Sequence, residues 1–142
     1  MQFAFPVRLQ PDETQIMAVA PDVRGGATEA DTEAEVMVEI VDCLIAALGG
    51  YVDLDQDLPV PSALAPGERL VVLPPLVSAK LALYRAMREA GLSREALATR
   101  LGTDEAAVRR LLDLDRKTPI ADIDRALAAL GKRLVVAVED AA

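Results

Sequence analysis

Residues Leu92–Leu112, LSREALATRLGTDEAAVRRLL, carry the clearest structural pattern in the C-terminal half of the chain. Ser93 is of a residue type that caps the start of a helix, and Gly102 allows the left-handed backbone of a tight turn. Ala98 is small at the point where two helices would cross. Apolar residues on both sides of the turn would fill a shared core: Leu97, Leu101, Val108 and Leu111. The pattern therefore predicts a helix-turn-helix.

The second helix of this motif, beginning at Thr103 or Asp104, would present polar and cationic side chains to the outside. Helical spacing places on that face Asp104, Glu105, Ala106, Arg109 and Arg110. In helix-turn-helix proteins this face meets base edges and phosphates in the major groove. The second helix is therefore a candidate DNA-reading element.

An ordinary helical hairpin that contacts only protein is the alternative, because the carboxylates of Asp104 and Glu105 would repel phosphate. Two observations favour DNA. Carboxylates in a first helical turn stabilise the helix, and glutamate can accept a hydrogen bond from cytosine N4. The pair Arg109–Arg110, one turn later, supplies donors for guanine or phosphate. Further positive charge lies nearby in the sequence, at Arg94, Arg100, Arg116 and Lys117.

Two more helices and a strand are expected in this half. A row at spacings of three and four predicts a helix over residues 76–90: Leu76, Lys80, Leu83, Tyr84 and Met87. A last helix should begin after Thr118–Pro119 and end at Gly131. Residues 133–138, RLVVAV, predict a C-terminal strand, which must find a partner because a lone strand leaves its backbone groups unpaired. It could join the sheet of the N-terminal half or pair with the same strand of a second protomer. We favour the second, because helix-turn-helix proteins usually bind as dimers.

The N-terminal half predicts a small antiparallel sheet packed on one helix. Strands are expected over residues 3–9, 14–19 and 69–73, the first two joined by a turn at Pro11–Glu13. Thr32 and Glu35 have the spacing of a capping box, so a helix should begin there, and Gly49–Gly50 should end it. The predicted fold class is α+β: this sheet with its helix, followed by an all-helical helix-turn-helix module and a C-terminal strand.

Charge divides the 142 residues near Pro75. Residues 1–75 hold 13 acidic and 3 basic residues, a net charge of −10, whereas residues 76–142 hold 10 acidic and 12 basic residues, a net charge of +2. We therefore predict two domains, 1–75 and 76–142, with different partners. The alternative is that the acidic excess is a solvated surface that improves solubility.

Composition excludes several function classes. The chain has 0 His, which removes Ser/His/Asp and Cys/His triads and histidine-ligated zinc. Cys43, the single cysteine, lies among apolar neighbours and is expected to be a structural thiol and not a nucleophile. No signal peptide and no stretch of about 20 apolar residues is present, so we expect a cytoplasmic protein without a membrane partner. No metal or cofactor is expected.

Short matches in a fixed order over most of the chain resemble the HicB family of antitoxins, and the helix-turn-helix resembles the Cro/C1 type. The matching stretches are Phe5–Leu9, Pro21–Val23, Gly26–Thr28, Asp31–Thr32, Leu58–Ser62, Val72–Pro75, Lys80–Arg88, Leu111–Asp113 and Ala126–Leu134. The resemblance implies an N-terminal module with a partial RNase H-like fold that binds and masks a small basic HicA-type toxin, which cleaves RNA. It also implies a C-terminal module that binds operator double-stranded DNA and represses its own operon. Because helix-turn-helix proteins usually bind as dimers, we expect a homodimer or a higher homo-oligomer.

Two sets of site residues follow from this resemblance. Those expected to contact DNA are Ser93, Arg94, Thr103, Glu105, Ala106, Arg109 and Arg110, the first two at a helix N-terminus against phosphate. Those expected to contact the toxin are Asp53, Asp55, Asp57, Pro59, Pro61 and Ser62. The charge division agrees with the two roles, because an acidic module suits a basic protein and a separate basic face suits DNA.

Two rival functions are open to the sequence. An active metal-dependent nuclease would need clustered carboxylates, but the first expected strand has no Asp or Glu, and Asp12, Asp22 and Asp31 fall in turns and a cap. We therefore predict that the protein is not an enzyme. A stand-alone transcriptional regulator, with an acidic module that senses a protein or a ligand, is the closer rival.

Overall fold

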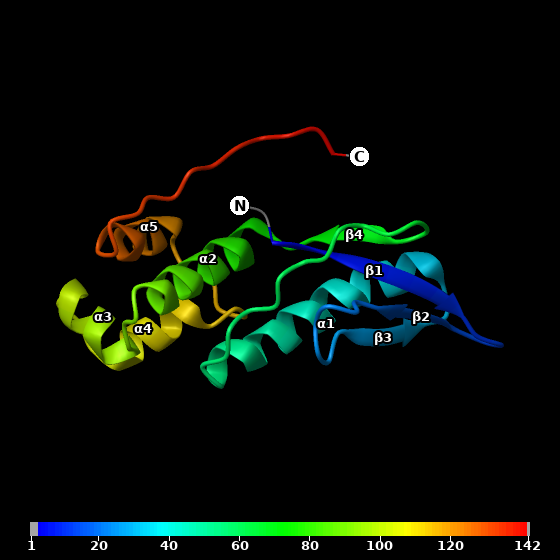
Figure 1. Ribbon diagram of the computed structural model, residues 1–142, viewed down its shortest axis with the longest axis horizontal. Coiled ribbons are helices and arrows are strands. Elements are labelled where there is room, and N and C mark those ends of the chain that lie inside the picture. Colours follow the sequence, from blue (N-terminus) through cyan, green and yellow to red (C-terminus); the bar gives the residue numbers. More distant parts are fainter. Residues whose placement is uncertain (1–2, 142) are drawn as a thin grey trace.

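A four-stranded antiparallel sheet and one long helix form the N-terminal half of the computed structural model, which describes residues 3–141 (Figure 1). The strands are β1 (Ala4–Pro11), β2 (Ile16–Val19), β3 (Ala27–Ala30) and β4 (Arg69–Val72), in the order β3-β2-β1-β4. Arg8 lies opposite Val19 between β1 and β2, and Phe5 lies opposite Val71 between β1 and β4. The predicted hairpin and the predicted strand near residue 70 are therefore confirmed.

The helix α1 (Glu33–Asp53) begins where the capping box predicts, but it ends later. The Thr32 hydroxyl accepts a hydrogen bond from the Glu35 backbone N–H. The prediction that Gly49–Gly50 ends the helix is wrong. Both glycines are helical, at a cost of about 1 kcal/mol each relative to alanine, and burial of Val52 in the next turn offsets it. The side chains that α1 buries recur every four residues: Val36, Ile40, Leu44, Leu48 and Val52.

Strand β3 has little sequence signal, because Thr28 is the single good strand former in Ala-Thr-Glu-Ala. Its position comes from the preceding turn, where the Ala20 N–H donates to the Gly26 carbonyl at 2.7 Å. A Cβ atom at Gly26 would lie 2.9 Å from the Val23 carbonyl oxygen, so this close turn requires glycine. The half-buried Cys43 thiol of α1 shares its hydrogen between the Gly25 carbonyl oxygen at 3.3 Å and the Ala27 carbonyl oxygen at 3.4 Å, so it ties the turn and the start of β3 to α1.

Four helices form the C-terminal half: α2 (Pro75–Glu89), α3 (Arg94–Leu101), α4 (Glu105–Leu112) and α5 (Ile120–Ala128). In Figure 1, α2 lies between the sheet and the other three helices. Gly102 takes the left-handed backbone, φ 69°, in the turn between α3 and α4, and Leu97 and Val108 are fully buried beside it. The predicted α+β class, with the helices after the sheet, is confirmed. None of the helices in residues 3–141 is both long and apolar enough to span a membrane.

The prediction of a C-terminal strand over residues 133–138 is wrong for the single chain. The tail, residues 132–141, is extended, and no strand of residues 3–141 pairs with it. It runs back along α2 toward β4 (Figure 1) and lines a groove with Phe3, Val72 and Ala82. Its valines are exposed, Val138 by 97%. The strand-forming sequence therefore lacks the partner that a strand needs.

One apolar core runs through both halves of the chain. It extends from Phe5 and Val7 on the sheet, through Leu81 and Tyr84 on α2, to Ile123 on α5. The division into two domains, 1–75 and 76–142, stays a prediction.

Candidate nucleic-acid interface and acidic loop

The outward face of α4 carries the side chains expected there. Asp104 caps the helix, because its carboxylate accepts from the Ala107 backbone N–H at 2.9 Å. Ala106, Arg109 and Arg110 are exposed. The Arg109 guanidinium donates to Glu105 Oε1 from Nη2 at 2.6 Å and from Nε at 3.0 Å, so Glu105 holds it in one orientation on the helix surface. Arg110 has no side-chain partner within residues 3–141.

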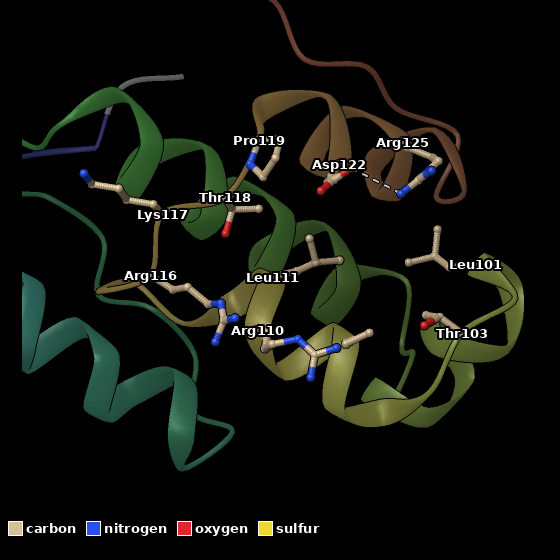
Figure 2. A pocket seen from close by; sticks show the side chains of 11 residues that line it. Leu101, Thr103, Arg110, Leu111, Arg116, Lys117, Thr118, Pro119, Asp122 and Arg125 are labelled. Atoms are coloured by element: carbon tan, nitrogen blue, oxygen red, sulfur yellow. Dashed lines mark hydrogen bonds and ion pairs between the residues drawn. The ribbon is translucent and has the colours of Figure 1, made fainter.

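A basic groove lies beside this face, between α4, the loop after it and α5 (Figure 2). Its volume is about 350 Å³, and it is bordered by Thr103, Arg110, Arg116 and Lys117. The three cations have no ion-pair partner in the described part of the chain, whereas Arg125 nearby is paired with Asp122 at 3.2 Å. Unpaired cations at a concave surface are available to an anionic ligand.

Lys80 sets the position of α4 and of the loop that follows it. This side chain is fully buried. Its Nζ donates to the carbonyl oxygens of Asp113 at 2.6 Å and Arg116 at 2.9 Å and to the Thr118 hydroxyl at 2.8 Å, which uses its three N–H groups, and it lies 3.4 Å from the Arg110 carbonyl oxygen. The ammonium therefore lies at the C-terminal end of α4, where a helix attracts positive charge.

Burial lowers the pKa of Lys80 below its ordinary value of 10.5, and the Asp113 carboxylate acts in the opposite direction. The sequence did contain a signal for this residue, because Lys80 falls in the apolar row of its helix. We did not predict that Lys80 is buried and structural, because a lysine on a helix is usually solvated.

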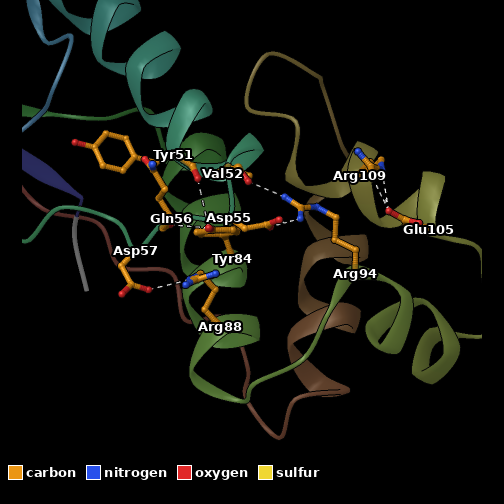
Figure 3. A network of polar contacts seen from close by, with 10 residues as sticks. All are labelled: Tyr51, Val52, Asp55, Gln56, Asp57, Tyr84, Arg88, Arg94, Glu105 and Arg109. Atoms are coloured by element: carbon orange, nitrogen blue, oxygen red, sulfur yellow. Dashed lines mark hydrogen bonds and ion pairs between the residues drawn. The ribbon is translucent and has the colours of Figure 1, made fainter.

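Ser93 and Arg94, expected at phosphate, lie at the start of α3. The Ser93 hydroxyl caps the helix by accepting from the Ala96 N–H at 3.1 Å. Arg94 points away from α4 to the end of α1 (Figure 3). Its guanidinium forms an ion pair with Asp55 and donates to the Val52 carbonyl at 2.7 Å, and only 13% of the side chain is exposed.

The acidic loop, defined as residues 53–62, begins at the last residue of α1 and lies against the helical half of the chain. Asp57 pairs with Arg88 at 2.9 Å, and Asp55 pairs with Arg94 (Figure 3). The Tyr84 hydroxyl, whose pKa is raised by burial, donates to the Gln56 carbonyl at 2.6 Å. Among the residues expected to contact the toxin, Asp53 is exposed and has no ion-pair partner in residues 3–141.

The remaining part of the acidic loop is fixed to the sheet side. The Ser62 backbone N–H and hydroxyl both donate to the Asp22 carboxylate at 2.7 Å. Pro59 and Pro61 are half-buried, and Val60 between them is 81% exposed. The structure therefore brings the expected residues onto one loop, although the polar groups of Ser62 are already used within the chain.

The described residues contain no group of three or more His, Cys, Asp or Glu side chains placed to hold a metal ion.

The chain combines a sheet that packs on one helix with a helix-turn-helix whose second helix carries exposed cations. This combination defines its structural class: a sheet-and-helix half followed by a helix-turn-helix half. Residues 4–82 match the family model of the HicB-like antitoxin of bacterial toxin-antitoxin systems. The chain is 34% identical over 130 residues to Antitoxin HicB 2 of Photorhabdus laumondii, covering 92% of both chains. It is 30% identical over 131 residues to Antitoxin HicB of Escherichia coli K12, covering 92% of this chain and 95% of the relative.

A third relative, Antitoxin HicB of Pseudomonas fluorescens, is 36% identical over 115 residues, which is 78% of this chain and 77% of the relative. The chain belongs to the HicB family of antitoxins. HicB antitoxins are not enzymes, which agrees with the prediction for this chain.

Proposed function

We propose that this antitoxin acts in the cytoplasm by binding and masking a small basic HicA-type toxin that cleaves RNA, and that it represses its own operon by binding operator DNA. The proposed binding to operator DNA rests on the exposed Arg109 and Arg110 of α4, which lie beside the unpaired cations of the basic groove. The observation that supports the first part is the net charge of −10 on residues 1–75. Complementary charge accelerates the encounter with a basic partner.

Some side chains on and beside the α4 face would contact bases, and others would contact phosphates. Arg109, held by Glu105, and Arg110 would donate to guanine or phosphate, and Ala106 leaves room for close approach of the helix. Thr103, Arg116 and Lys117 border the basic groove and would contact the sugar-phosphate backbone. Family membership favours this role, joined to an antitoxin, over a stand-alone regulator.

Co-expression tests the toxin-binding role. The full chain should restore growth to cells that express the short basic protein encoded next to it, and it should co-purify with that protein. Failure of both would contradict the antitoxin function and favour the stand-alone regulator.

Charge reversal on the acidic loop should weaken binding of the toxin. We expect the double substitution Asp53→Lys and Asp57→Lys to lower toxin affinity at least tenfold at low salt, with a smaller loss at high salt, because salt screens exposed charges. Isothermal titration calorimetry at two salt concentrations measures this. The matched control is Glu39→Lys with Asp42→Lys, an equal charge change on the exposed side of α1. Equal losses in both variants would place the toxin elsewhere than on the acidic loop.

The tail is the proposed dimer contact, as pairing with the same segment of a second copy would satisfy its backbone groups. Val136→Asp with Val138→Asp should convert a dimer into a monomer in light scattering, because it places charge where the two tails would pack. It should also weaken operator binding, since a dimer holds two half-sites. Val38→Asp, at a valine on α1 that is 68% exposed, is the control. A dimer that survives the tail substitutions would exclude this contact.

A further inference from the structure

Arg94 has contacts within the chain and an expected contact with DNA, and both use the same guanidinium. Within the chain it pairs with Asp55 and donates to the Val52 carbonyl. As the residue after the N-cap of α3, it is also an expected phosphate contact. With only 13% of its side chain exposed, Arg94 would have to leave Asp55 before it could reach DNA.

The end of α1 holds this arginine firmly. The last turn of α1 contains no basic residue, so the guanidinium of Arg94 supplies the positive charge that the C-terminal end of a helix attracts. Asp55, the residue after the C-cap Leu54, lies in the left-handed backbone region with φ 54°, which directs the chain out of the helix. Its carboxylate and the Val52 carbonyl together occupy both terminal nitrogens of Arg94.

Space for a second position of Arg94 is present. A cavity of about 510 Å³ opens beside the ion pair, and its walls include Asp55, Arg88, Arg94 and Arg109. Figure 3 shows Arg94 between the acidic loop and the Glu105–Arg109 pair of α4. The cavity therefore leaves room for the side chain to turn away from Asp55 toward α4 without opening the core.

We propose that Asp55 occupies Arg94 in place of a DNA phosphate, so that the acidic loop restrains DNA binding by the same chain. A basic protein that binds the acidic loop would take over the Asp55 carboxylate, release Arg94 and strengthen DNA binding. By linkage, DNA that takes Arg94 would strengthen binding of that protein to the same degree. This inference rests on the proposed function and adds its regulation.

The substitution Asp55→Asn tests the restraint without any partner. Asparagine tolerates the left-handed backbone, so the turn should keep its shape, which circular dichroism and thermal unfolding check. Operator affinity is measured by fluorescence anisotropy on the full chain at several salt concentrations. We expect Asp55→Asn to bind operator about three- to tenfold more tightly, with a steeper salt dependence by about 0.9 in the log–log slope, the value for one added phosphate contact.

Two controls separate the restraint from general charge effects. Asp42→Asn removes the same charge from an exposed position on α1 and should leave the slope unchanged. Adding Arg94→Gln to Asp55→Asn should abolish the gain in both affinity and slope. Equal affinities and slopes for Asp55→Asn and Asp42→Asn would overturn the restraint while operator binding stands. Absence of operator binding by the unaltered chain would instead overturn the proposed function.

The basic partner provides a second readout. Saturating toxin should tighten operator binding by the unaltered chain, and the same toxin should have a smaller effect on Asp55→Asn, in which Arg94 is already free. An equal toxin effect on both chains would show that the toxin does not act through Asp55.

Discussion

Replacing Arg109 and Arg110 together with alanine should abolish operator binding and leave toxin neutralisation intact. Each arginine that pairs well with a base contributes about 1–3 kcal/mol of discrimination, and each phosphate contact adds to the salt-dependent part of the affinity. Both side chains are exposed on α4, so their loss removes no core contact. A gel-shift titration measures DNA binding, and growth rescue measures neutralisation.

The two single variants should differ in a way that the ion pair explains. Arg110→Ala removes a cation without a side-chain partner in residues 3–141, whereas Arg109→Ala also leaves Glu105 unpaired beside the DNA. The Arg109 variant should therefore lose more affinity, because an uncompensated carboxylate faces phosphate. The control is Arg8→Ala with Arg69→Ala, which removes two positive charges from the sheet, where Arg8 pairs with Glu68 at 3.5 Å. A folded Arg109/Arg110 variant that fails to neutralise the toxin would refute the division of roles between the two halves.

Local chemistry explains which elements the sequence could predict. Thr32, Ser93 and Asp104 each cap a helix with their own side chain, and Gly102 makes the turn of the helix-turn-helix. These features depend on residues within four positions of one another. Strand β3 and the last turn of α1 depend instead on distant partners: β3 on pairing with β2, and Val52 on burial in the core. The unpaired tail shows the opposite case, in which a strand-forming sequence lacks its partner.

The same distinction between local and long-range contacts explains which parts of the candidate site could be predicted. The exposed face of α4 follows from helical periodicity, so Ala106, Arg109 and Arg110 could be placed from sequence. The pairing of Arg94 with Asp55, across 39 positions, has no local signal. The same holds for Ser62 with Asp22, and for the partners of the buried Lys80 ammonium, although the place of Lys80 in the apolar row of its helix is a local signal of its burial. Contacts between residues far apart in the sequence, of which the Arg94–Asp55 pair joins the two halves, therefore emerge only from the folded arrangement.

Among these long-range contacts, Lys80 has the largest expected effect on stability. The substitution Lys80→Met keeps the apolar part of the side chain but removes the donor for the Asp113 and Arg116 carbonyl oxygens and the Thr118 hydroxyl. A buried acceptor left without a donor costs about 1–3 kcal/mol. Part of this loss is offset, because methionine carries no charge into the interior. We expect the free energy of unfolding to fall by about 2–4 kcal/mol, measured by urea denaturation.

The effect of Lys80→Met should reach the basic groove as well. Arg116 and Thr118 are held through the atoms that Lys80 binds, so the loop between α4 and α5 should become mobile when the ammonium is lost. Operator affinity of the folded fraction should then fall, although no side chain expected at DNA has been changed. Lys132→Met, at an exposed lysine of the tail, is the control and should change stability by less than about 0.5 kcal/mol. If Lys80→Met were as stable as this control, the bonds from Lys80 would not be what holds the end of α4, and the apolar contacts of Leu112 and Leu114 would have to do so.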